Sequence, residues 1–262
     1  MGIQTDQKVA NKKPAALLLV GGLGTRLRSV ISERPKALAP IGDAPFLKLL
    51  LLELKSQGIR RIVMCTGHFA EQIEAEFGTG RGMGLDIAYS RELQPLGTAG
   101  AIKLAEKFVH DCSEFFVLNG DSFLELDFDE FTSFHRAHGG AATIALRRVD
   151  DTARYGTVQT GADQRILSFR EKLGVKQPGL INGGIYLFNR DVLDGLPQGA
   201  ASLEKDVLPS LLARRVYGFE ATGVFIDIGT PEDYTKAQSL LTSYTEKEAA
   251  SSRSDRVQRG SR

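Results

Sequence analysis

Short apolar segments alternate with helical patterns through the first half of the chain, and this alternation limits the possible folds more than any other feature. The apolar segments are bounded by glycine, proline or polar residues, as buried strands are. Phe69, Ile73 and Phe77 lie four residues apart, which places them on one face of a helix. Strand-helix-strand repeats predict right-handed crossovers and a mostly parallel sheet with helices on both faces. The predicted strands are 15–20, 60–66, 85–89 and 115–119, and the predicted helices are 46–57, 69–77 and 98–109.

The second half of the chain changes to a run of closely spaced strands. Only short turns separate the first three, and short turns favour antiparallel pairing because parallel neighbours need a long crossover. The sequence therefore predicts a mixed central sheet flanked by helices: one α/β domain with an antiparallel extension. The predicted strands are 141–149, 156–160, 166–170, 184–188 and 224–228, and helical patterns return at 203–212 and 231–241.

Composition and charge limit the classes of partner. The 262 residues include 33 basic and 32 acidic side chains, so no field of the whole molecule attracts nucleic acid or an anionic membrane. No basic stripe with interleaved aromatic residues is present, which argues against nucleic-acid binding. The longest apolar run, 15–20, is too short to span a bilayer. We therefore expect small-molecule substrates bound at a local anion site, in a monomer or small homo-oligomer.

Both ends of the chain are polar, and we expect them to be disordered tails around one folded domain, 15–244. Residues 1–14 lack the apolar segment of a signal peptide. Residues 245–262 combine charged with small residues and have little to bury. Cys65 and Cys112 have neither metal-ligand nor redox spacing, so we expect free thiols in a reducing, cytoplasmic compartment.

The most informative segment is the glycine-rich loop after the first predicted strand, which runs GGLGTRLR from Gly21 to Arg28. Glycines there let backbone N–H groups approach a phosphate, because no Cβ intervenes, and a guanidinium can take two phosphate oxygens. The loop has neither the G-x-G-x-x-G spacing of a dinucleotide turn nor the G-x-x-x-x-G-K-[ST] pattern of a P-loop. A glycine pair alone is also typical of an ordinary turn. Arg26 and the Pro35-Lys36 pair favour a triphosphate-binding loop of a third kind.

The order Gly-Gly-x-Gly-Thr-Arg-Leu, followed by Pro-Lys, resembles the signature of the sugar-1-phosphate nucleotidyltransferases, and the resemblance extends at least through Asp233. It implies a Rossmann-like, GT-A-like domain that joins a nucleoside triphosphate to a sugar 1-phosphate with Mg²⁺ and releases pyrophosphate. It also implies that Arg26 stabilises the leaving pyrophosphate and that Lys36 holds phosphate charge. Many members have a proline soon after the leucine, where this chain has Arg28-Ser29-Val30; we expect a different loop shape and the same chemistry. The residues implied to bind the nucleotide are Leu19, Gly21, Gly22, Gly24, Thr25, Asn119 and Gly120.

Two aspartates lie at the carboxyl ends of predicted strands, with glycine close by: Asp121 follows the strand 115–119, and Asp227 closes the strand that begins at Val224. Carboxylates at the carboxyl ends of strands can converge on one cleft, and Mg²⁺ needs only one or two of them. Turn-forming aspartates beside glycine are also common, so the pattern alone leaves an ordinary turn open. The resemblance implies that both residues are metal ligands.

A further group of polar residues lies in the second half of the chain, and the resemblance implies that it binds the sugar 1-phosphate. Lys172 would hold the attacking phosphate, and Glu171 and Glu204 would accept hydrogen bonds from sugar hydroxyls. Without the resemblance, Glu171-Lys172 is an ordinary surface pair, and Glu204 is a solvated acid favoured at a helix N-terminus. The residues implied to complete the sugar site are Tyr155, Gly156, Asn182 and Gly183.

Leu96-Gly97-Thr98 resembles the start of the family's nucleobase loop, in which Gly97 lets the base edge reach main-chain groups. Glu92 lies five residues before Gly97. A carboxylate that accepts two hydrogen bonds suits guanine, which offers N1–H and a 2-amino group on one edge, whereas uracil or thymine needs a donor and an acceptor together. The pattern favours GTP, with a solvent-facing Glu92 as the alternative.

Within the family, four segments are most similar to the D-glycero-α-D-manno-heptose 1-phosphate guanylyltransferases, which supply a GDP-activated heptose to bacterial surface glycans such as lipopolysaccharide or capsule. Mannose 1-phosphate guanylyltransferases and N-acetylmuramate or hexose 1-phosphate uridylyltransferases remain alternatives. Two other classes stay open: a sensor that binds sugar nucleotides without catalysis, and a nicotinamide-dependent oxidoreductase, which the glycine spacing opposes. The four segments are 92–101, 182–186, 202–206 and 225–229.

His135 and His138 lie three residues apart on a predicted helix, a spacing that can serve a metal. No carboxylate or cysteine partner is evident, so we expect both histidines on the helix surface.

Overall fold

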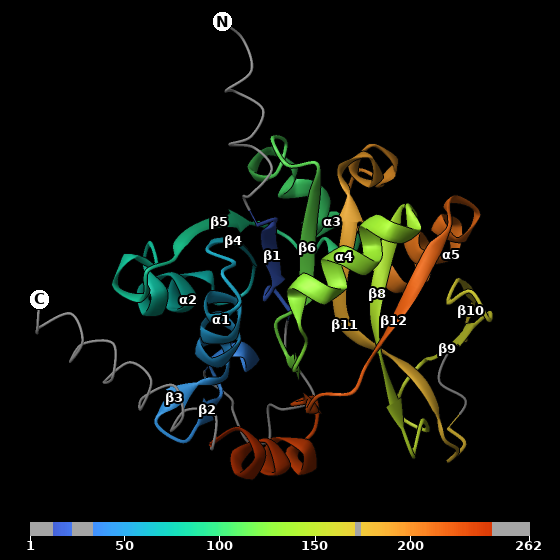
Figure 1. Cartoon of the computed structure of the whole chain (residues 1–262). Coiled ribbons are helices and arrows are strands. Elements are labelled where there is room, and N and C mark those ends of the chain that lie inside the picture. The colour runs from blue at the N-terminus through green and yellow to red at the C-terminus, as the bar shows by residue number, and fades with distance from the viewer. Residues whose placement is uncertain (1–12, 23–33, 171–173, 243–262) are drawn as a thin grey trace, which may run out of the picture.

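The computed structural model describes residues 13–22, 34–170 and 174–242. Nine strands of this part of the chain form one mixed sheet, with parallel and antiparallel neighbours (Figure 1). Their bounds are β1 Ala15–Leu19, β4 Arg61–Thr66, β5 Asp86–Arg91, β6 Glu114–Asn119, β8 Ala142–Val149, β9 Thr157–Thr160, β10 Ile166–Arg170, β11 Gly179–Asn189 and β12 Val216–Ala221. The order along the main path is β10-β9-β11-β6-β1-β4-β5, and β8 and β12 continue from β11.

The parallel part of the sheet is centred on β1, which pairs with β4 on one side and with β6 on the other. β4 and β5 follow β1 in the chain and lie on one side of it, whereas β6, the next strand of the sheet, lies on the other side. The strand order therefore reverses at β1. Open α/β sheets bind ligands at such a reversal, outside the carboxyl ends of the strands. The register sets Leu19 between Cys65 and Asn119 at this edge.

The antiparallel part of the sheet is organised by β11, which pairs with β6, β8 and β9. The prediction of antiparallel pairing is confirmed, but β8 and β9 do not pair with each other, because β11 lies between them. β11 is also longer than the predicted 184–188. Its register against β8 shifts between Asn182 and Tyr186, around Gly184 with its φ of +79°. The glycine permits this bulge, because a side chain disfavours that conformation.

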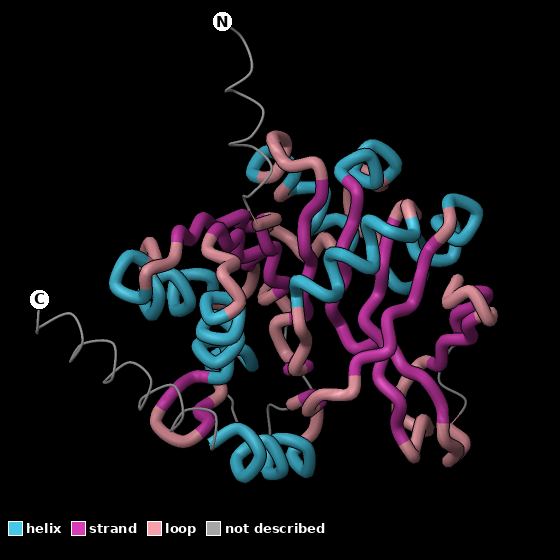
Figure 2. The backbone as a smooth tube through the Cα atoms, in the orientation of Figure 1, coloured by secondary structure: helices cyan, strands magenta, loops and turns pink. Residues whose placement is uncertain are grey.

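Both faces of the sheet are buried beneath helices, as predicted (Figure 2). Alternate residues of β1 face opposite sides: Leu18 packs in one hydrophobic core and Leu17 in the other. α1 Phe46–Ser56, α2 Ala70–Phe77, α4 Phe128–His138 and helical residues 231–242 contribute to the first core. α3 Gly97–Leu104 and the helical residues from 203 to 211 contribute to the second. Among the described helices, none is long and apolar enough to cross a membrane.

Two predicted helices, 98–109 and 203–212, are each divided into shorter helical elements of different type. Residues 203–212, predicted as one helix, begin with a π-helical turn, continue as a short α-helix and end as a 3₁₀ turn. In place of the predicted helix 98–109, the α-helix ends at Leu104 and a separate 3₁₀ turn follows at Glu106–Phe108. The remaining helical elements are η2 Lys36–Leu38, η3 Arg81–Met83, η4 Glu106–Phe108, η5 Arg190–Gly195, η6 Leu203–Val207, α5 Leu208–Leu211 and η7 Leu212–Arg214.

Two small strand pairs position the segments that lead into the candidate site. β7 Ser122–Leu124 pairs antiparallel with β13 Phe225–Asp227, so that Asp227 lies opposite Ser122. β2 Pro40–Ile41 and β3 Ala44–Pro45 form a hairpin directly after η2. Helical residues 231–242 hold this hairpin, since the Tyr234 hydroxyl donates to the Pro40 carbonyl and the Gln238 side chain accepts from the Gly42 N–H.

His135 lies in the core, and its prediction as a surface residue was wrong. The side chain is 2% exposed on α4, with Nδ1 2.8 Å from the Thr143 hydroxyl and Nε2 3.0 Å from the Asn189 side-chain oxygen. Burial lowers the pKa of this imidazole and so favours its neutral form. A histidine on an amphipathic helix is tolerated inside when both ring nitrogens have partners, and those partners come from β8 and β11, distant in sequence.

Phe116 offers a test of the first core. Its ring packs edge-on against Phe128, with centroids 5.1 Å apart, and is fully buried. Phe116→Ala should lower the free energy of unfolding by about 3–5 kcal/mol, because the surrounding rings cannot fill the cavity. Leu167→Ala, at a side chain 59% exposed, should change it by less than about 0.5 kcal/mol. Urea denaturation measures both, and similar losses in the two variants would contradict the core assignment.

Candidate functional site

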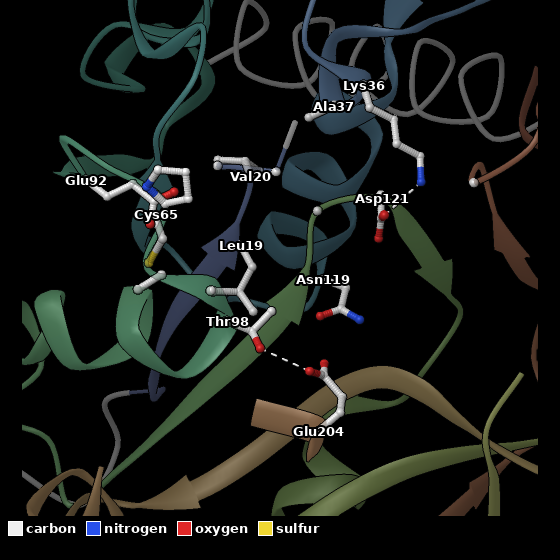
Figure 3. Close-up of a pocket in the computed structure, with 17 residues that line it drawn as sticks. Leu19, Val20, Lys36, Ala37, Cys65, Glu92, Thr98, Asn119, Asp121 and Glu204 are labelled. Carbon is white, nitrogen blue, oxygen red and sulfur yellow. Dashed lines mark hydrogen bonds and ion pairs between the residues drawn. The ribbon is translucent and has the colours of Figure 1, made fainter. Parts of the chain in front are cut away.

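A pocket of about 400 Å³ lies at the carboxyl edge of the parallel strands, where the strand order reverses (Figure 3). Its walls come from the ends of β1, β4 and β6, from η2, from the start of α3 and from the turn after β13. The predicted site residues that line it are Leu19, Gly21, Gly22, Lys36, Glu92, Gly97, Thr98, Asn119, Gly120, Asp121 and Glu204. The fold therefore brings together residues from the predicted nucleotide, metal and sugar sites.

Three charged groups meet at one side of the pocket. The Lys36 ammonium lies 2.7 Å from Asp121 Oδ2 and 3.6 Å from Asp227 Oδ1. The Lys36 side chain is 11% exposed, against 44% for Asp121 and 27% for Asp227. The backbone holds the two aspartates together as well, because the Ile228 N–H donates to the Asp121 carbonyl at 3.0 Å. Two carboxylates from opposite halves of the chain thus converge on one cation.

Glu92 lies at the opposite side of the pocket, next to the glycine turn that follows β1 (Figure 3). Its Oε2 accepts a hydrogen bond from the Leu96 N–H at 3.0 Å, which fixes the side chain within its own loop. Burial raises the pKa of Glu92, and that hydrogen bond opposes the rise. Burial also raises the pKa of the neighbouring Cys65 thiol to about 12, with a smaller contribution from the Glu92 charge. Cys65 is therefore a neutral wall residue and no nucleophile.

The Glu204 carboxylate is held at the lower side of the pocket in Figure 3 by three side-chain donors. The hydroxyls of Thr98 and Ser202 lie 3.0 and 3.1 Å from Oε2, and the Tyr186 hydroxyl lies 3.4 Å from Oε1. Tyr186 in turn accepts a hydrogen bond from the Asn182 amide at 2.7 Å. Asn182 does not line the pocket itself but is connected to it through this chain of contacts.

Other predicted site residues do not line the pocket. The Tyr155 ring contacts Phe225 of β13 at a centroid distance of 6.1 Å, on the side of Asp227. Burial, followed by the Asp227 charge, raises the pKa of Tyr155 to about 12. Leu96 supplies main-chain groups next to the pocket, and Gly156 and Gly183 pack against the strands β10 and β8. Five predicted residues lie outside the described part of the chain: Gly24, Thr25, Arg26, Glu171 and Lys172.

The pocket also contains residues that the sequence analysis did not select. Val20 follows the last residue of β1 and Cys65 precedes the last residue of β4, so both line the pocket at the carboxyl ends of neighbouring parallel strands, a position that strand register could have indicated. The small side chains Ala37 and Ala101 leave space beside Lys36 and Thr98, and no local sequence signal distinguishes them from other alanines. The full set not selected is Val20, Ala37, Cys65, Pro95, Ala101 and Gly229.

The donor set at Asp121 and Asp227 fits a hard divalent cation. Two carboxylates already converge on a positive charge, and their oxygens are the ligand type that Mg²⁺ prefers. Within residues 13–22, 34–170 and 174–242, no group of three or more His, Cys, Asp or Glu side chains is gathered as a metal site. A metal at this position would therefore keep coordination positions for ligands other than the protein, as Mg²⁺ bound to phosphates does.

Comparison with known proteins gives consistent results. The family described as nucleotidyl transferase matches residues 15–244. A D-glycero-α-D-manno-heptose 1-phosphate guanylyltransferase from Aneurinibacillus thermoaerophilus is 42% identical over 231 residues, 87% of this chain and 99% of its own length. A mannose-1-phosphate guanylyltransferase from Mycobacterium tuberculosis is 37% identical over 238 residues, 89% of this chain and 66% of its own length.

The fold is similar to that of HddC from Yersinia pseudotuberculosis. Its crystal structure gives a TM-score of 0.78 at 36% sequence identity, covering 87% of this chain and 99% of that one. The same protein complexed with GMP-PN gives a TM-score of 0.79 at 35% identity over the same shares of the two chains. The mixed α/β fold predicted from the sequence is confirmed by this similarity.

Gly97 provides a test of how tightly the pocket wall is packed. Its φ is +68°, and a Cβ there would lie 2.5 Å from the Ala201 carbonyl oxygen. Gly97→Ala should therefore lose about 1–2 kcal/mol of unfolding free energy to the left-handed conformation and about 1–3 kcal/mol more to overpacking.

Gly139→Ala is the matched control. Gly139 has a φ of +61°, but nothing lies within 4 Å of the added Cβ. Chemical denaturation of both variants separates the two contributions. Equal losses of unfolding free energy in the two variants would show that the backbone at Ala201 moves to accommodate the added methyl group without loss of stability.

Proposed function

The chain belongs to the nucleotidyl transferase family, and we propose that it transfers GMP from GTP to D-glycero-α-D-manno-heptose 1-phosphate with release of pyrophosphate. The observation that carries the proposal is the meeting of Asp121, Asp227 and Lys36 at one pocket, which Asp121 and Lys36 line and which Asp227 adjoins through its contact with Lys36. A pocket with a converging carboxylate pair and an ammonium suits substrates that are polyanions bound with a divalent cation.

The proposed sugar is a heptose because of the similarities already described. The chain shares 42% identity with a heptose 1-phosphate guanylyltransferase and spans 99% of its length, whereas it spans 66% of the mannose-1-phosphate guanylyltransferase. Mannose 1-phosphate is the nearest alternative. The product would be a GDP-activated heptose, the donor form from which a bacterial surface glycan is assembled.

The proposed base is guanine. Glu92 borders the pocket beside the glycine turn, and its Oε1 is the closest atom to a Cβ built on Gly21 or Gly67. One oxygen accepts from the Leu96 N–H, and the carboxylate retains further acceptor positions for the two adjacent N–H donors of guanine. A pyrimidine, which presents a donor beside an acceptor, would leave one of these contacts unmade.

We propose that Asp121 and Asp227 hold Mg²⁺. When bound, the ion would offset the negative charge of the phosphates. The Lys36 ammonium now lies against both carboxylates, so a cation and a phosphate can replace the contacts that these groups make to one another. Lys36 would then hold phosphate oxygens as a point charge.

The protein would act chiefly by positioning and charge. An oxygen of the sugar phosphate attacks the α-phosphorus in line, the bond to the β-phosphate oxygen breaks, and pyrophosphate leaves with the electron pair. The attacking oxygen is already an anion, so no protein nucleophile or general base is required. Holding two polyanions in line lowers the barrier through orientation and electrostatic stabilisation. By resemblance, Arg26 and Lys172 would add charge at the pyrophosphate and at the sugar phosphate.

The proposal is tested by measuring pyrophosphate release with a panel of substrates. GTP, UTP, dTTP, CTP and ATP are each combined with heptose, mannose, glucose and N-acetylmuramate 1-phosphates. We expect the highest kcat/KM for GTP with D-glycero-α-D-manno-heptose 1-phosphate. Higher kcat/KM with mannose 1-phosphate would replace the sugar assignment, and nucleotide binding without turnover for any pair would reject the enzymatic proposal.

Asp121→Asn and Asp227→Asn test the metal site. Each substitution removes one negative charge with little change in shape, so both should raise the Mg²⁺ concentration for half-maximal turnover and lower kcat by about 10²–10³-fold. Asp194→Asn, at an exposed position outside the pocket, serves as the control with wild-type behaviour. An unchanged Mg²⁺ dependence in both site variants would contradict the assignment of these carboxylates.

A further inference from the structure

Two segments distant in sequence, residues 96–100 and 199–201, pack against each other next to the pocket. The Ala201 N–H donates to the Leu96 carbonyl at 2.8 Å, and the Ala99 N–H donates to the Ala201 carbonyl at 2.9 Å. Gly97 and Gly100 lie so close to residues 199–201 that neither has space for a Cβ. The base loop, residues 96–100, is therefore built against the segment that leads to Glu204.

Thr98 links the base loop to Glu204 through its hydroxyl. That hydroxyl accepts from the Leu203 N–H at 2.6 Å and lies 3.0 Å from Glu204 Oε2. A hydroxyl has one proton to donate, and the ionised carboxylate cannot donate, so the Thr98 proton is directed at Glu204. Thr98 lines the pocket, but its hydroxyl proton is donated to Glu204 within the protein (Figure 3).

The Glu204 carboxylate is largely satisfied by the protein. Thr98 and Ser202 contact Oε2, and the fully buried Tyr186 contacts Oε1. An ionised carboxylate accepts about four hydrogen bonds, so the three protein donors leave about one acceptor position, on Oε1. Since Glu204 lines the pocket, that position is available to a single hydroxyl donor of a ligand. Sugars are rich in such donors, whereas phosphates are acceptors.

We propose that Thr98 is a positioning residue for the sugar: from the base loop, its hydroxyl orients Glu204 to accept a hydrogen bond from one sugar hydroxyl. The inference rests on the proposed function.

Thr98→Val, which keeps the shape and removes the hydroxyl, tests the role of Thr98. We expect the KM for D-glycero-α-D-manno-heptose 1-phosphate to rise about tenfold, as for loss of a hydrogen bond to a charged group. The Kd for GTP, measured by calorimetry with Mg²⁺ and without the sugar phosphate, should stay within about threefold of wild type, because nucleotide contacts are retained. Thr98→Ser, which restores the hydroxyl, should recover the wild-type KM.

Two further variants strengthen the test. Tyr186→Phe removes the hydroxyl that donates to the other oxygen of Glu204. It should raise the KM for the sugar phosphate and leave the Kd for GTP unchanged. This second variant keeps the inference testable if Thr98→Val does not fold. Thr235→Val is the control, because Thr235 is exposed on helical residues 231–242 and its hydroxyl donates to the Pro231 carbonyl, away from the pocket. It should retain both wild-type constants.

The outcomes separate this inference from the proposed function. Wild-type protein that releases no pyrophosphate with any sugar phosphate rejects the function. Wild-type turnover with an unchanged sugar KM in Thr98→Val overturns the role of Thr98. A rise of the GTP Kd equal to that of the sugar KM also overturns it, because Thr98 would then serve the nucleotide directly.

Discussion

The attraction between the Lys36 ammonium and the carboxylates of Asp121 and Asp227 is the interaction on which the site depends. Its three partners come from remote parts of the chain, and each is delivered by a different element. β6 ends beside β1 and leads to Asp121, the pairing of β13 with β7 brings Asp227 next to it, and the turn η2 presents Lys36. Helical residues 231–242 brace the hairpin that follows η2. Without the Lys36 ammonium between them, the like charges of the two aspartates would repel one another at close range.

Much of the fold follows from local patterns in the sequence. Apolar runs such as 15–20 and 60–66 predicted strands because a strand buried on both faces has no polar side, and the stripe of Ile73 and Phe77 predicted α2. What the patterns could not give is the pairing of strands remote in sequence. β11 lies between β8 and β9 and its register against β8 shifts around Gly184. The buried place of His135 depends on hydrogen-bond partners that only the folded sheet supplies.

The candidate site was predictable where function requires an unusual residue type at the end of a strand. Asp121 has such a signal after β6, Lys36 has one in the Pro35-Lys36 pair, and the structure places both in one pocket. The roles assigned to Arg26 and Lys172 remain predictions, because these residues lie outside the described part of the chain. The contact of Tyr186 with Glu204 had no sequence signal, since a buried tyrosine in an apolar strand resembles any other core residue until its hydroxyl partner is known.

The close packing of residues 96–100 against 199–201 affects how such proteins can be recombined. Because the Ala201 backbone occupies the space that a side chain at position 97 would need, and the Gly199 backbone the space at position 100, the two segments must change together. A chimera that receives the base loop of a relative without its matching partner segment would bring together backbones shaped for different neighbours. Replacing residues 96–100 in this scaffold therefore calls for replacing residues 199–201 in the same step.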